Sequence, residues 1–182
     1  MENKKTSVFG LFASSAAAER GVDALLNAGF SNNAISVLMQ DNESTKDFAH
    51  EKHTKAPEGT TTGAATGGVV GGTLGLLAGI GMLAVPGIGP FIAAGPIMSA
   101  LAGIGVGGAV GGLIGALVGL GIPEYEAKRY EGHLKNGGVL LSVHCDTADE
   151  INRAKHILTG TSATDIAATG ETPVAETHTT HA

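Results

Sequence analysis

His144 and Cys145 are adjacent residues whose side chains belong to the types that bind metal ions. Imidazole nitrogen and thiolate sulfur are the ligands that zinc prefers. The stretch VLLSVHC that holds them is predicted to be a strand, and neighbouring side chains of a strand point to opposite faces of its sheet. The two residues are therefore not expected to share one ion. We expect Cys145 to pack in the core, in line with the apolar residues at every second position before it.

Two further pairs of histidines have a spacing that could hold a metal weakly. They are His50 with His53, and His178 with His181, and both pairs stand in polar stretches. Histidines in solvated linkers and tails are the commoner explanation of such a pattern, so no metal site is predicted. The sequence also lacks GxSxG, and it gives no basis for a Ser/His/Asp arrangement.

Glycine-rich stretches such as GVGGAVGG resemble phosphate-binding loops in spacing alone. No Lys-Ser or Lys-Thr follows them, and no acidic residue stands about 20 residues beyond a strand–helix turn. Because glycine recurs throughout this region, chance matches are expected. The sequence therefore predicts no nucleotide site, no cofactor and no enzymatic activity.

The same glycines recur at a fixed spacing of four, in two runs. The first run is Gly63, Gly67, Gly71, Gly75 and Gly79, and the second is Gly103, Gly107, Gly111, Gly115 and Gly119. Eight glycines between positions 63 and 81 would cost an isolated helix roughly 8 kcal/mol relative to alanine. Close packing of two helices would offset that cost, because glycine lets backbones approach each other.

The two runs are arranged almost as mirror images about Phe91. If the chain folds back there, residue i faces residue 182 minus i, and each glycine of the first run faces one of the second. PGIGPFIAAGP would form the turn, with Pro86, Pro90 and Pro96 ending the helices. The pattern predicts an antiparallel glycine-zipper hairpin over residues 62–122, with a second smooth face for contact with another copy.

The arms of this hairpin, residues 62–84 and 97–121, are long enough to cross a bilayer, at about 35 Å each. No charged residue occurs from Gly59 to Pro123, while lysines and arginines stand on both outer flanks. The positive-inside rule then places both termini in the cytoplasm and the hairpin in the cytoplasmic membrane. The alternative is a cytoplasmic, soluble homo-oligomer that buries its hairpins.

The flanks of the hairpin contain alternating and helical patterns. Residues 1–40 predict a βαβ unit, with a strand from Thr6 to Phe12, a helix capped by Ser14 or Ser15, and a strand in AISVLMQ. Residues 41–61 are a polar linker. Residues 123–168 predict αβαβ: a helix with Tyr125, Ala127, Tyr130 and Leu134 on its buried side, the strand VLLSVHC, a helix with a Thr147–Glu150 capping box, and a short strand at residues 163–167.

Together the two flanks predict an α+β fold, a split ferredoxin-like sandwich with the hairpin inserted between its halves. The tail, residues 169–182, is polar and predicted to be disordered. The net charge of -6 excludes the basic surface that nucleic-acid binding needs. With one cysteine the chain forms no internal disulfide. No ligand of the small domain is identified.

Three stretches carry a resemblance to a known family: SVFGLFASSAAAERGVDALLNAGFSNNAISVLMQD, GLLAGIGMLAVPGIGPFIAAGP and IPEYEAKRYEGHLKNGGVLLSVHCD. Over residues 6 to about 168 the chain resembles bacterial proteins with a heat-induced general stress protein domain. It is more distantly similar to a membrane subunit of a quinol-oxidising respiratory complex. The resemblance implies a role in the stress response and transfers no catalytic residues.

The sequence as a whole predicts a non-enzymatic stress-response protein that contacts membrane lipid and self-assembles through its glycine-rich hairpin. Two alternatives stay open. One is the soluble homo-oligomer, and the other is an accessory subunit of a membrane respiratory complex.

Overall fold

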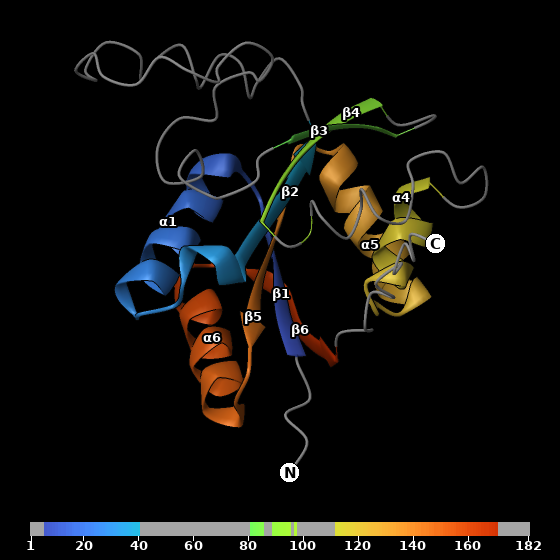
Figure 1. The fold of residues 1–182 in the computed structure, drawn as a ribbon. Helices are drawn as coiled ribbons and strands as arrows, with labels where there is room; N and C mark the ends of the chain where they lie inside the picture. The colour runs from blue at the N-terminus through green and yellow to red at the C-terminus, as the bar shows by residue number, and fades with distance from the viewer. Residues whose placement is uncertain (1–5, 41–80, 86–88, 96, 98–111, 171–182) are drawn as a thin grey trace, which may run out of the picture.

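The computed structural model describes residues 6–40, 81–85, 89–95, 97 and 112–170 (Figure 1). These residues form one antiparallel sheet of six strands in the order β3-β4-β2-β5-β1-β6. Helices α1 and α6 lie on one face of the sheet, and α4 and α5 lie on the other (Figure 1). The chain is therefore α+β with an antiparallel sheet, as the sequence predicts.

The strands are β1 (Thr6–Phe12), β2 (Ile35–Gln40), β3 (Gly81–Val85), β4 (Gly89–Ala94), β5 (Val139–Cys145) and β6 (Thr164–Gly170). The helices are α1 (Ser15–Asn27), α4 (Gly112–Gly119), α5 (Glu124–Lys135) and α6 (Ala148–Gly160), with a short 3-10 turn, η1 (Asn32–Ala34). The strands predicted at the two flanks are confirmed. The last of them begins and ends later than predicted, so Thr169 and Gly170 belong to β6 and not to the tail.

Local signals set the ends of α1. The Ser14 side chain accepts a hydrogen bond from the backbone N–H of Ala17 at 3.3 Å, and this bond satisfies a donor that the first helical turn leaves without a partner. At the other end, Gly29 has a φ of +90°, in the left-handed region that glycine adopts without strain. Both signals are visible in the sequence, and both predictions are confirmed.

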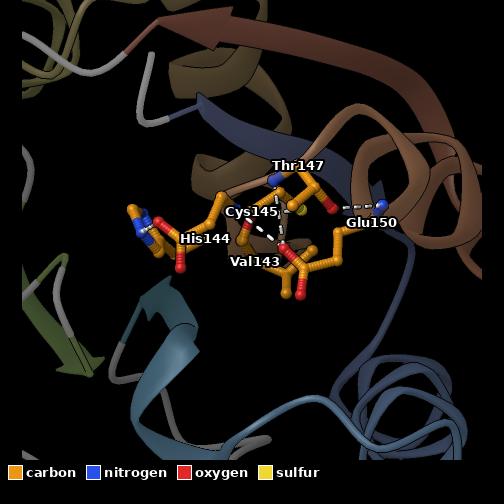
Figure 2. A network of polar contacts seen from close by, with 6 residues as sticks. Val143, His144, Cys145, Thr147 and Glu150 are labelled. Atoms are coloured by element: carbon orange, nitrogen blue, oxygen red, sulfur yellow. Dashed lines mark hydrogen bonds and ion pairs between the residues drawn. The ribbon is translucent and has the colours of Figure 1, made fainter. Parts of the chain in front are cut away.

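Helix α6 begins with the capping box that the sequence predicts (Figure 2). The backbone N–H of Glu150 donates to Thr147 Oγ1 at 3.2 Å, and the backbone N–H of Thr147 donates to Glu150 Oε2 at 3.2 Å. Glu150 Oε2 also accepts from the N–H of Asp146 at 2.8 Å. This arrangement fixes the turn between β5 and α6, because it satisfies the first donors of the helix.

Alternation along the strands builds two cores. One core lies between the sheet and α1 and α6, and the other lies between the sheet and α4 and α5. In β1, for example, Val8 and Phe12 belong to the first core, while Phe9 and Leu11 belong to the second. The sheet is thus covered on both faces, and β1, β2 and β5 are buried over most of their length.

Helix α5 buries Ala127, Tyr130 and Leu134, as predicted, but the prediction for Tyr125 is wrong. The side chain of Tyr125 is 73% exposed. At about 100° per residue it points some 200° away from Ala127, on the opposite side of the helix from the buried stripe. Its ring instead lies 5.9 Å from the Arg129 guanidinium.

The middle of the predicted hairpin is a pair of strands and not a helical turn. Gly81–Val85 forms β3 and Gly89–Ala94 forms β4, so the helical prediction for residues 81–84 is wrong. The chain reverses between Val85 and Gly89, which pair with each other, and not near Phe91. Paired positions in this hairpin sum to 174, against the 182 that the glycine pattern suggests.

The physical reason lies in the prolines and in the free edge of β2. Proline excludes a helix through this stretch, whereas a strand beside β2 satisfies the backbone groups of both partners. Pro90 lies inside β4, opposite Ala84, and not in the turn. β2 pairs with Phe91–Ala94 only, so Pro90 stands just beyond that ladder, where its missing N–H is tolerated.

Candidate functional site

The structure places the sequence-predicted packing residues unevenly. Gly115 and Gly119 lie in α4, and Pro90 lies in β4. The remaining positions lie outside the described residues: Gly63, Gly67, Gly71, Gly75, Gly79, Gly103, Gly107, Gly111, Pro86 and Pro96. The linker 41–61 and the four histidines of the polar stretches lie outside them as well. The zipper pairing therefore stays a prediction.

His144 and Cys145 point to opposite faces of the sheet, as predicted (Figure 2). Cys145 is 1% exposed, and its thiol donates to the Val143 carbonyl oxygen at 3.7 Å. His144 lies on the other face, with Nε2 3.2 Å from Asp146 Oδ1. Within the described part of the chain, no three His, Cys, Asp or Glu side chains gather as a metal site would require.

Sequence reasoning missed a set of hydroxyl groups beside His144. Ser7 in β1 stands opposite both His144 and Thr169, and Ser36 in β2 stands opposite Ser142 in β5. We call these five residues the polar row. Residues opposite each other in antiparallel strands have Cβ atoms about 5 Å apart. The two opposed sets are linked through β5, where His144 and Ser142 stand two residues apart on the same face. The signal in the sequence is a polar residue at alternate positions, but only the register between distant strands joins them.

A serine beside a histidine that contacts an aspartate has the residue types of an activated nucleophile. Burial opposes that use here, because Ser7, Ser36 and Ser142 are 8%, 1% and 4% exposed. Such hydroxyls are closed to a substrate in this arrangement. Ser36 and Thr169 instead form structural hydrogen bonds to the glycine-rich segment, residues 62–122.

Ser36 anchors the outgoing end of β4. Its hydroxyl oxygen accepts a buried hydrogen bond of 3.1 Å from the backbone N–H of Ile97. Between them in the chain, Gly95 has a φ of +77°, and a Cβ there would overlap the carbonyl oxygen of Ile35. Only glycine permits this close crossing of backbone over β2. The crossing carries Ile97, which is 3% exposed, into the core beneath α4 and α5.

Thr169 anchors the returning end of the segment. Its hydroxyl donates to the carbonyl oxygen of Gly121 at 2.7 Å, in the turn between α4 and α5. Gly121 has a φ of +89°, which the turn requires. Leu113 and Leu117 of α4 are buried in the core, at 2% and 0% exposure. Helix α4 is thus held by apolar packing and by a bond to the last strand of the sheet.

A second group of contacts joins α5 to β6. The Arg129 guanidinium forms an ion pair with Asp165, whose φ of +50° is unusual for a residue other than glycine. The Tyr130 hydroxyl donates to the Asp165 carbonyl oxygen at 3.2 Å. Burial, assisted by the carboxylates of Glu126 and Asp165, raises the pKa of Tyr130 to about 12. The phenol therefore stays protonated and keeps its role as a donor.

Comparison with known proteins gives no relative: no family model, no curated protein and no solved structure matches this chain. Among the described residues, none of the helices has both the length and the apolar character needed to cross a bilayer. The site that the structure does define is the anchorage, formed by Ser36, Gly95, Ile97, Gly121 and Thr169, through which the α/β part holds the glycine-rich segment.

Proposed function

We propose that this protein is a non-enzymatic stress-response protein whose α/β part holds a glycine-rich segment for self-assembly and membrane association. The observation that carries the proposal is the anchorage on either side of the second glycine run, at Ile97 before it and at Gly121 after it. β4 joins the sheet and Ile97 bonds to Ser36, while α4 packs in the core and the turn after it bonds to Thr169. The folded α/β part thereby holds the uncharged stretch from Gly59 to Pro123 at fixed points.

The α/β part is proposed to be a ferredoxin-like sandwich. Four strands of the sheet are neighbours in the order β2-β5-β1-β6, and α1 and α6 cover the same face. That is the strand order expected when two βαβ units interleave, with the glycine-rich segment entering between β2 and β5. The arrangement supports the split sandwich predicted from the sequence, with β3 and β4 added at the free edge of β2.

The resemblance of residues 6 to about 168 to the heat-induced general stress protein domain supports the stress-response part of the proposal. The self-assembly part rests on the glycines spaced four apart, since such spacing lets backbones approach. Gly115 and Gly119 stand in a helix, as that mode of packing requires. The membrane part rests on the absence of charge from Gly59 to Pro123.

One observation favours the alternative of an oligomer that buries its glycine-rich segments against protein. Leu113 and Leu117, at the end of the second predicted arm, pack against the sheet and α5. The last turns of that arm, in α4, therefore contact protein on the face that carries Leu113 and Leu117. In this alternative the self-assembly remains and lipid contact is lost.

Fractionation of native cells, followed by an alkaline carbonate wash, tests the proposal. We expect the protein to sediment with membranes and to remain there after the wash. Recovery of all the protein without detergent, as an oligomer, would replace membrane association by the buried-segment alternative. Recovery as a monomer would overturn self-assembly as well. Copurification of haem or iron–sulfur proteins would instead favour the accessory subunit of a respiratory complex.

A further inference from the structure

The two edge strands of the sheet differ in whether their residues hinder pairing with a strand of another chain. Among the strands that the structure describes, β6 forms one edge and β3 forms the other. An edge strand carries a row of backbone N–H and C=O groups that can pair with another strand. Proteins commonly prevent such pairing with charged residues, bulges or irregular backbone.

β6 carries several of these devices. Asp165 places a carboxylate and a positive φ within the strand, and its charge is held by Arg129. The register between β1 and β6 also shifts between Phe9 and Leu11, so the ladder is irregular near Asp165. A further strand would meet a bent edge with a charge on it. This edge is therefore poorly suited to pairing.

β3 carries none of them. Its sequence, GMLAV, contains neither a charged residue nor a proline. Its pairing with β4 is unbroken, from Gly81 opposite Ala93 to Val85 opposite Gly89. The closest charged residues along the chain are Glu58 and Glu124. Figure 1 shows β3 and β4 side by side, next to β2.

We propose that β3 pairs antiparallel with β3 of a second copy of this chain, and that this edge is a contact through which the protein self-assembles. An antiparallel pair of identical strands is related by a two-fold axis, so each strand offers the other the same donors and acceptors. Two uncharged strands approach without repulsion, even though the whole chain carries a net charge of -6. The two sheets become one continuous sheet of twelve strands. The inference rests on the proposed self-assembly and names one of its surfaces.

Leu83→Lys tests this contact, with Ala168→Lys as its matched control. Each variant adds one lysine to an edge strand, the first to β3 and the second to β6. Sedimentation velocity of the full chain measures the molar mass. We expect Leu83→Lys to lower the mass about twofold at a concentration where the wild type is associated, because a charge on an edge blocks pairing. Ala168→Lys should keep the wild-type mass. Hydrogen exchange in β1 and β5 should be unchanged in both variants, which shows that the sheet stays folded.

Cysteine cross-linking locates the contact in the same chain. Met82→Cys, Leu83→Cys and Ala84→Cys are each made in a Cys145→Ala background, with Ala168→Cys as the control. Mild oxidation should give covalent dimers at the position nearest the two-fold axis and few at 168. Equal dimer formation at 168, or none at 82–84, would overturn the pairing. If Leu83→Lys keeps the wild-type mass while Gly71→Leu lowers it, the edge contact is wrong and the proposed function stands. If neither variant lowers the mass, both are wrong.

Discussion

The hydroxyl oxygen of Ser36 accepts a buried hydrogen bond from the backbone N–H of Ile97, 61 residues further along the chain. This bond connects a strand of the central sheet to Ile97, a residue of the core that follows β4 in the chain. Through it the α/β part holds the chain just before the second glycine run. Gly95 permits the crossing at this point, because a Cβ there would overlap the carbonyl oxygen of Ile35.

Ser36→Ala should destabilise the protein by about 1–3 kcal/mol, because it leaves the buried N–H of Ile97 without its acceptor. Chemical denaturation measures the change in the free energy of unfolding. Ser142→Ala removes another buried hydroxyl, from the facing strand, and should cost less. Equal losses in the two variants would show that the bond to Ile97 is unimportant.

Gly95→Ala should cost more than Gly29→Ala. Both glycines have positive φ, so alanine is strained by about 1–2 kcal/mol at either site. A Cβ at position 29 meets nothing within 4 Å, whereas one at position 95 overlaps the backbone of β2. We expect Gly95→Ala to speed hydrogen exchange in β4 while the amides of β1 and β5 stay protected. Similar effects of the two substitutions would contradict the close crossing.

Gly21→Ala and Gly132→Ala should change the stability in opposite directions. A Cβ at Gly21 would lie 2.6 Å from Phe12 Cζ, so α1 or the buried Phe12 ring must move, at a cost of roughly 1–3 kcal/mol. Gly132 lies in α5 with open space around it, and alanine there should stabilise the helix by about 0.5–1 kcal/mol. Thermal unfolding measures both. A stabilising Gly21→Ala would mean that the contact with the Phe12 ring is looser than it is here.

The buried Tyr130 is expected to make the free energy of unfolding fall at alkaline pH. Its pKa of about 12 in the folded protein lies above the ordinary value of 10.0. Between these values the unfolded chain loses the phenolic proton while the folded protein keeps it, so the contribution of Tyr130 is fully present below pH 10 and falls as pH rises towards 12. Urea unfolding at pH 8 to 11.5 should show a steeper alkaline loss in the wild type than in Tyr130→Phe. Tyr125→Phe, at an exposed position of the same helix, should behave like the wild type. Parallel profiles for all three proteins would show that Tyr130 titrates normally.

Much of the α/β part could be predicted from the sequence, because its signals are local. Ser14, Gly29 and the Thr147–Glu150 capping box mark helix ends within a few residues of themselves, and apolar alternation marks β1, β2 and β5. The opposite faces of His144 and Cys145 follow from strand geometry alone.

The rest depends on partners far away in the chain. Gly81–Val85 is a strand because it pairs with β4, which itself pairs with the edge of β2, and a glycine pattern with period four carries no information on either pairing. The polar row likewise exists only because the register sets Ser7 opposite His144 and Ser36 opposite Ser142. Helix α4 was within the predicted second arm, but its packing in the core needed the sheet to be in place.

Sedimentation of glycine variants of the full chain determines whether the glycine-rich segment drives self-assembly. Gly71→Leu and Gly111→Leu place large side chains at the predicted contact, while Gly132→Leu places the same side chain at an open position of α5. We predict that the wild type and Gly132→Leu sediment as the same oligomer, and that Gly71→Leu and Gly111→Leu sediment as smaller species. An unchanged oligomer in both glycine-run variants would contradict the account.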